Sequence, residues 1–131
     1  MIVVDTDVLI DYLTGTQPVA EQVRAYAESD SLQTSAITCF ELLSGARDNK
    51  RGDQVRRLVA AIPVLPLDRE AAAAAAVVRQ RLARGGASIG MADSLIAGVA
   101  LAHNLPLLTR NGKHFENIEG LRLVPIAHPA N

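Results

Sequence analysis

The sequence predicts an α/β fold, in which a parallel sheet is flanked by helices on both faces. Short runs of β-branched and aliphatic residues alternate along the chain with longer segments of helical periodicity, and that alternation is typical of βαβ units. The first run, Ile2–Val4, is apolar throughout, as expected of a strand buried on both faces. The length of 131 residues suits one domain, so we expect a single domain over residues 1–131.

The first half of the chain supplies the first two strands and several helices. Apolar residues recur at the spacing of one helical face over Pro18–Glu28, which predicts a helix. Leu32–Ile37 predicts the second strand, and Thr38 is a suitable cap for a helix that runs to about Asp48. Gly52–Ala61 predicts another helix, which ends before a proline.

The second half of the chain continues the alternation. Val64–Leu67 predicts a third strand, and its proline, Pro66, favours the edge of the sheet. Asp68 is expected to cap an alanine-rich helix that ends at Gly85–Gly86, and an apolar helix follows over Ile89–His103. Two more strands are expected at Leu105–Thr109 and Leu121–Val124.

Bulk composition excludes several classes of protein without identifying a function. The chain is 49% hydrophobic and 21% charged, with a net charge of −1. It therefore neither favours nor excludes a nucleic-acid partner, which needs only a local basic patch. No apolar stretch approaches the ~20 residues of a membrane span, and the N-terminus lacks the basic region of a signal peptide. The single cysteine, Cys39, fits a reducing compartment, so we expect a cytoplasmic protein.

Three acidic residues lie in apolar surroundings, where carboxylates are rarely found without a partner. Asp5 directly follows the first strand, and ligands of parallel α/β sheets bind at the carboxyl ends of the strands. Glu41 and Asp93 lie near the starts of two apolar helices. If the three converge they need a cation, because two carboxylates ~4 Å apart repel by ~4 kcal/mol at an effective dielectric of ~20. Ligands that are all oxygen favour Mg²⁺ or Mn²⁺.

Polar residues beside these acids extend the candidate site. Thr6 follows Asp5 and is a candidate donor to a metal ligand or to a phosphate, and it fits equally well a turn residue that opens the next helix. Thr109 and Asn111 leave the fourth strand, and they emerge beside the first strand if these two strands are neighbours. The candidate phosphate contacts are Arg47, Arg110 and Lys113. The 3 histidines show no zinc-ligand spacing and are interpreted as structural.

Simpler interpretations stay open for the same residues taken one at a time. Asp93 fits an acid that interacts with a helix dipole, and Glu41 fits a capping-box partner of Thr38. Asp7 and Asp11 are expected to cap the short helix after the first strand and to face solvent. The basic residues are also compatible with ordinary surface positions.

At these residues the chain resembles a PIN-domain ribonuclease of the VapC toxin type. The matching segments are Val3–Thr6, Ser35–Leu42, Gly90–Ala97 and Leu108–Asn111 with Phe115. Their order and spacing match those of the family, and the resemblance covers nearly the whole chain. It implies a three-layer fold whose five-stranded parallel sheet has the order 3-2-1-4-5.

The resemblance also implies an activity and partners. Asp5, Glu41 and Asp93 match the family's acidic triad, which implies Mg²⁺-dependent hydrolysis of RNA phosphodiester bonds, with Mn²⁺ able to substitute. It further implies the toxin of a toxin–antitoxin pair, a homodimer neutralised by a cognate antitoxin. Many relatives carry a fourth acid where this chain has Asn111, so we expect one metal ion in the free enzyme.

Three other functions are compatible with parts of the sequence. A PIN nuclease that processes RNA would carry the same site. Asp5-Thr6-Asp7 after an apolar strand also resembles the start of a haloacid-dehalogenase-type phosphatase, but the lysine and the late acidic pair of that enzyme do not follow. A receiver-like signalling domain would place its phosphorylated acid at the end of the third strand, where Asp68 lies, although Asp68 also suits a helix cap.

Overall fold

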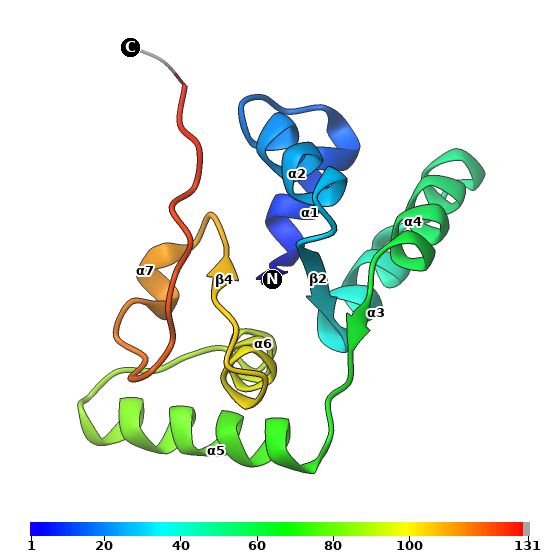
Figure 1. Cartoon of the computed structure of the whole chain (residues 1–131). Helices are drawn as coiled ribbons and strands as arrows, with labels where there is room; N and C mark the ends of the chain where they lie inside the picture. Colours follow the sequence, from blue (N-terminus) through cyan, green and yellow to red (C-terminus); the bar gives the residue numbers. More distant parts are fainter. Residues whose placement is uncertain (130–131) are drawn as a thin grey trace.

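The computed structural model describes residues 1–129 and contains a parallel sheet with helices on both faces (Figure 1). Within these residues the sheet has four strands in the order β3-β2-β1-β4. Their bounds are β1 (Ile2–Val4), β2 (Leu32–Ser35), β3 (Val64–Leu65) and β4 (Leu107–Leu108). Every pair is parallel, and Val3 lies between Gln33 and Leu107. The predicted α/β class is confirmed, as is the position of β3 at the edge.

The helices form two layers because alternate residues of β1 point to opposite faces of the sheet. The helices are α1 (Thr6–Thr14), α2 (Val19–Glu28), α3 (Ala36–Gly45), α4 (Asn49–Ala61), α5 (Arg69–Arg84), α6 (Met91–Ala102) and α7 (Gly112–Phe115). Ile2 and Val4 pack in one core with residues of α1, α2 and α4. Val3 packs in the other with residues of α5 and α6. In the described part of the chain, none of the helices is both long and apolar enough to cross a membrane.

A glycine allows α6, the helix that carries Asp93, to lie close against α5 (Figure 1). A Cβ atom on Gly98 would lie 2.4 Å from the carbonyl oxygen of Ala71, far inside van der Waals contact. Any side chain at this position would push the two helices apart. The position of Asp93 relative to the sheet therefore depends on this glycine.

Short polar side chains begin several helices. Asp68 caps α5 by accepting a hydrogen bond from the N–H of Ala71, as predicted. Asp48 caps α4 and does not end the preceding helix. The predicted cap of α3 was wrong: the hydroxyl of Ser35 accepts from the N–H of Thr38 at 3.1 Å, and Thr38 lies inside the helix. Strand β2 ends earlier than expected because Ser35 caps the helix well, despite the β-branched residues after it.

The predicted fifth strand, Leu121–Val124, is reduced to an isolated bridge between Leu107 and Leu123. Two backbone hydrogen bonds of 2.9 Å, both made by Leu107, flank the bridge. The ladder stops there because β4 has only two residues and Pro125 has no N–H with which to continue it. The segment still runs beside β4, in the place of the fifth strand. The four strands and this segment therefore follow the expected order 3-2-1-4-5.

Candidate active site

Asp5 is the central acid of the candidate site. It follows β1, caps α1 and is only 4% exposed. Its Oδ1 accepts a hydrogen bond from the N–H of Thr6 at 2.7 Å, and its Oδ2 accepts from the Thr109 hydroxyl at 2.6 Å. Burial raises the pKa of the Asp5 carboxyl to about 6; the two hydrogen bonds oppose this rise, and the charges of Asp7 and Asp93 add to it. The carboxylate therefore lies in a poorly solvated and negatively charged environment.

Thr6 connects Asp5 to the second acid, Glu41. Its hydroxyl lies 2.7 Å from Oε1 of Glu41 and 3.0 Å from the hydroxyl of Thr38, while its N–H donates to Asp5. Glu41 is half-buried on α3. The capping box considered for Glu41 and Thr38 does not form, because Ser35 caps this helix. One threonine thus holds two of the three acids.

Asp93 lies in the first turn of α6 and is half-buried. Its Oδ2 is 3.1 Å from Nδ1 of His114, an exposed residue of α7. Asp93 is also near enough to Asp5 for its charge to raise that residue's pKa. Over residues 1–129, no three His, Cys, Asp or Glu side chains come close enough in this structure to enclose a metal ion by themselves. The three acids therefore lie around one place without forming a closed ligand cage.

A second acidic pair, on α1, contacts the segment that leaves β4. Nε of Arg110 is 3.1 Å from Oδ2 of Asp11, and the backbone N–H of Arg110 donates to Oδ2 of Asp7 at 3.3 Å. The side-chain amide of Asn111 donates to the same Asp7 oxygen at 3.0 Å. The prediction that Asp7 and Asp11 face solvent was wrong, since the side chains are 16% and 8% exposed. Burial raises the pKa of the Asp7 carboxyl, and the charge of Arg110 opposes this rise.

Comparisons with known proteins agree with this arrangement. The family described as PIN domain matches residues 2–121. This chain belongs to the PIN-domain family. It is 30% identical to the tRNA(fMet)-specific endonuclease VapC of Shigella flexneri, over 90% of this chain and 92% of that protein. It is 31% identical to the ribonuclease VapC1 of Methanocaldococcus jannaschii, over 93% of this chain and 85% of that protein.

Solved structures give the same result for this PIN domain. The DNA-bound VapBC complex from Salmonella typhimurium contains a chain that is 27% identical and superposes with a TM-score of 0.79, covering 95% of this chain and 98% of that one. A chain of VapBC2 from Rickettsia felis, bound to a fragment of promoter DNA, superposes with a TM-score of 0.85, covering 95% of this chain and 98% of that one. Its identity is 22%, so it supports the fold alone.

VapC-type PIN nucleases depend on divalent metal ions, and the residues of this PIN domain fit such an ion. The acids near β1 offer only oxygen donors, which hard divalent cations prefer. Asp7 Oδ1 is buried without a hydrogen-bond partner among the described residues, and the pKa of Asp5 is raised in part by its acidic neighbours. A cation at this edge of the sheet would give Asp7 Oδ1 a partner and would reduce the repulsion between Asp5 and its acidic neighbours.

The three basic residues predicted to contact phosphate occupy different environments. The side chain of Arg110 is 49% exposed, but its guanidinium is held by Asp11. Lys113 is exposed on α7, beside the residue that contacts Asp93. Arg47 is exposed in the connection between α3 and α4. Of the three, only Lys113 both neighbours a residue that contacts one of the acids and forms no ion pair in the described structure.

Two residues near the acids were not predicted. Arg51, at the start of α4, lines a groove together with Glu41, and His114, interpreted as structural, contacts Asp93. Neither has a local sequence signal, because its position depends on how one helix packs against another. Thr38 could have been found, since it lies three residues before Glu41 and therefore on the same face of α3.

Proposed function

We propose that this PIN domain is a metal-dependent endoribonuclease that acts as the toxin of a toxin–antitoxin pair. The observation that carries the proposal is the grouping of Asp5, Glu41 and Asp93 at the carboxyl end of β1, with the pKa of Asp5 raised to about 6. The names of the VapC relatives support RNA as the substrate. We retain a single domain over residues 1–131 and a cytoplasmic location as parts of the same proposal.

We assign Asp5, Glu41 and Asp93 as ligands of Mg²⁺, for which Mn²⁺ can substitute. The bound ion would lower the pKa of a water molecule and offset negative charge on the phosphodiester. Hydrogen bonds within the protein orient these carboxylates for the ion. Thr109 and the N–H of Thr6 fix both oxygens of Asp5, and the Thr6 hydroxyl orients Glu41.

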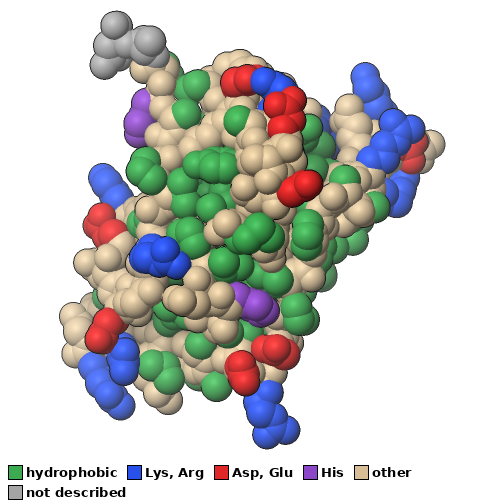
Figure 2. Space-filling model, viewed as in Figure 1, with side chains coloured by type: hydrophobic (Ala, Val, Ile, Leu, Met, Phe, Trp, Pro, Cys, Tyr) green, Lys and Arg blue, Asp and Glu red, His purple; other side chains and the backbone are tan. Residues whose placement is uncertain are grey.

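In this PIN domain we expect individual basic residues, and not a broad basic surface, to contact the phosphates of the substrate. Lys and Arg side chains do not form one continuous surface on the face shown in Figure 2; they lie mainly at its margins, with a group over α4. This agrees with the net charge of −1. We assign Lys113 as the principal phosphate contact, with Arg110 and Arg47 as weaker ones. A single-stranded RNA is the preferred substrate, because the bases of a duplex are not accessible to side chains.

A protein partner is supported by an exposed apolar groove beside Glu41. Phe40 and Met91 are 68% and 67% exposed, and with Leu67 they line a groove of about 440 Å³ that Glu41 also borders. Large exposed apolar surfaces commonly mark interfaces, and the Salmonella structure is a VapBC complex. We propose that an antitoxin and a second copy of the toxin cover this region. Light scattering that reports a strict monomer at high micromolar concentration would count against the homodimer.

RNA cleavage by purified protein tests the activity. A labelled single-stranded RNA should be cut internally in millimolar Mg²⁺ or Mn²⁺, and not in EDTA. Asp93→Asn should fold and fail to cut. Asp53→Asn, at an exposed acid paired only with Arg56 in the described residues, is the matched control and should cut normally. Cleavage by Asp93→Asn at the wild-type rate would contradict the site.

The alternatives are less well supported. Asp68 is the N-cap of α5 at the edge of the sheet, which does not fit the phosphorylated acid of a receiver domain. The match to the PIN family argues against a phosphatase. An RNA-processing role uses the same chemistry, and growth arrest on expression of the wild type, absent with Asp93→Asn, would favour the toxin.

A further inference from the structure

We propose that a groove beside α7 is a nucleotide subsite, which holds one base of single-stranded RNA next to the phosphate that is cut. This α7 groove has a volume of about 470 Å³, and its walls include Asn111, Gly112, Lys113, Leu123, Val124 and Ile126. Figure 1 shows its two sides, α7 and the C-terminal segment that runs beside β4. The inference rests on the proposed ribonuclease function and adds the place where the substrate is bound.

The α7 groove is continuous with the acids. Thr109, which donates to Asp5, also lines the groove. His114, which lies 3.1 Å from Asp93, lines it too. A strand of RNA whose phosphate reaches these acids therefore has its neighbouring nucleotide at the mouth of this groove.

The two walls of the groove suit the two parts of a nucleotide. One wall is aliphatic, formed by Leu123, Val124 and Ile126, and offers a surface on which the flat face of a base can lie. The lining on the α7 side includes Lys113, whose ammonium group suits a phosphate. Glu116 is the one acid on this wall among the described residues, and it offers an acceptor to the edge of a base.

An aliphatic wall matters because this chain has few aromatic residues on which bases could stack. Only 3% of its residues are aromatic. Phe115 is next to His114 in sequence, but its side chain is fully buried among α6 and β4 residues. The exposed Phe40 borders the separate groove beside Glu41, and no Phe or Tyr lines the α7 groove in the described structure. Base binding in the α7 groove therefore uses the aliphatic and polar side chains that line it.

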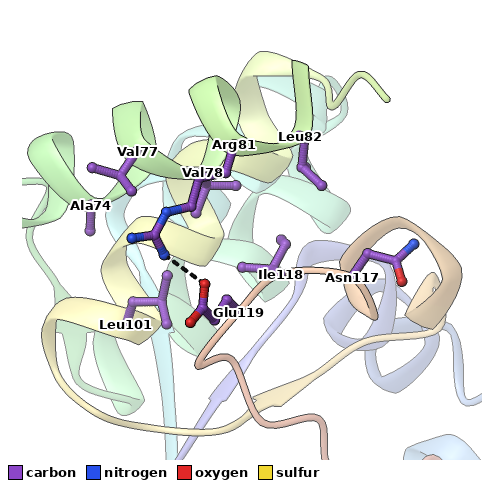
Figure 3. A pocket seen from close by; sticks show the side chains of 9 residues that line it. All are labelled: Ala74, Val77, Val78, Arg81, Leu82, Leu101, Asn117, Ile118 and Glu119. Atoms are coloured by element: carbon purple, nitrogen blue, oxygen red, sulfur yellow. Dashed lines mark hydrogen bonds and ion pairs between the residues drawn. The ribbon is translucent and has the colours of Figure 1, made fainter. Parts of the chain in front are cut away.

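Another cavity is a useful control because it is separate from the acids. It lies between α5, α6 and the segment after α7, has a volume of about 290 Å³, and shares no lining residue with the α7 groove. Figure 3 shows its aliphatic side chains together with the ion pair between Arg81 and Glu119, at 3.0 Å. None of its lining residues forms a hydrogen bond or an ion pair with Asp5, Glu41 or Asp93 in the described structure.

The test measures the effect of removing one base at a time from the substrate. A single-stranded RNA that contains the cut site is made with an abasic nucleotide at each position that flanks the cut. For the wild type, kcat/KM should fall about fivefold to tenfold at one flanking position, which is the lower range for loss of a stacked base. At positions further away it should change little.

Two variants assign that position to the α7 groove. Gly112→Leu fills it: a Cβ on Gly112 would meet only Leu123 Cδ1 within 4 Å, at 3.9 Å, so a larger side chain can enter the groove without a clash at its base. This variant should lower kcat/KM on intact RNA and lose the sensitivity to the abasic position.

Lys113→Ala should raise KM and reduce the slope of log KM against log salt by ~0.7. Val77→Leu and Arg81→Ala, in the cavity of Figure 3, are matched controls and should retain the wild-type profile.

The outcomes separate the subsite from the nuclease. A wild type that cuts no RNA overturns the ribonuclease and the subsite together. A wild type that cuts RNA, with Gly112→Leu as sensitive to the abasic position as the wild type and Lys113→Ala unchanged in KM, overturns the subsite alone. If Gly112→Leu keeps the abasic profile but is no longer inhibited by a co-purified antitoxin, the groove binds protein and not RNA, and the inference is wrong.

Discussion

The hydroxyl of Thr109 donates a 2.6 Å hydrogen bond to Oδ2 of Asp5, joining the end of β4 to the end of β1 across 104 positions of sequence. Both side chains are buried. The same hydroxyl oxygen accepts from the N–H of Asn111 at 3.0 Å, so its orientation is fixed by the backbone. The bond opposes the rise in the pKa of Asp5 that burial causes, and it therefore favours the charged form that binds a cation.

Thr109→Val should destabilise the metal-free protein at pH 8. The substitution keeps the shape of the side chain but leaves a buried carboxylate oxygen without its donor, which costs about 1–3 kcal/mol. It should also move the pKa of Asp5 above about 6, because the bond that lowers this pKa is lost. Urea unfolding in EDTA at several pH values measures both effects. Thr109→Ser retains the hydroxyl and is the control; a Thr109→Val protein that is no less stable than Thr109→Ser would show that the hydrogen bond contributes little.

Asp5 should make the metal-free protein less stable as the pH rises. Its pKa is about 6 in the folded protein, against 3.8 for an ordinary aspartate such as that of the unfolded chain, so the folded state binds the proton more tightly. The stabilising effect of that proton is complete below pH 3.8 and is lost as the pH rises through about 6. The full effect is about 3 kcal/mol, of which about 1–1.5 kcal/mol falls between pH 5 and pH 8.

Urea unfolding of the wild type and Asp5→Asn in EDTA checks this contribution. The variant has no proton to lose at this position, so the free energy of unfolding should fall less between pH 5 and pH 8 than it does in the wild type. Millimolar Mg²⁺ should stabilise the wild type at pH 8 more than at pH 5, because protons and the cation compete for the same carboxylates. Identical pH dependence in the two proteins would contradict the raised pKa of Asp5.

The sequence was sufficient to find the acids near β1, but not the contacts between distant segments. Asp5 is recognisable because it ends a continuous apolar run, and Glu41 and Asp93 because they interrupt apolar helices. The environment of Asp11 was not predictable, since Arg110 approaches it from the other end of the chain. The same limit applies to His114, whose contact with Asp93 depends on the packing of α7 against α6.

Arg110→Ala should destabilise the protein whether or not RNA is present. The Asp11 side chain is 8% exposed and is paired with Arg110 at 3.1 Å. Removing the guanidinium leaves a buried charge without its partner, which costs about 3–5 kcal/mol for a fully buried pair. Arg110 is 49% exposed, so solvent screening reduces the expected loss to about 1–3 kcal/mol.

Chemical denaturation of three variants tests this role of Arg110. Asp11→Asn in the Arg110→Ala background removes the unpaired charge and should recover part of the lost stability. Arg57→Ala, at an exposed position on α4, should change the free energy of unfolding by less than about 0.5 kcal/mol. If Arg110→Ala is as stable as the wild type and only binds RNA more weakly, Arg110 is a phosphate contact and not a support for α1.

Asn111→Ala should cost much less activity than Asp5→Asn or Asp93→Asn. The Asn111 amide donates to Asp7 at 3.0 Å and is exposed, so its loss removes a neutral donor to a neighbouring acid and no carboxylate near Asp5. The expected loss of transition-state stabilisation is about 1–2 kcal/mol, or roughly five- to thirtyfold in rate.

Asn111→Asp would place a second negative charge beside Asp7, and it should destabilise the metal-free protein while tightening Mg²⁺ binding. Single-turnover RNA cleavage by these variants across a Mg²⁺ titration separates the effects. A loss in Asn111→Ala as deep as that in Asp5→Asn would show that position 111 is an essential ligand, and that the absence of a fourth acid does not limit the free enzyme to one metal ion.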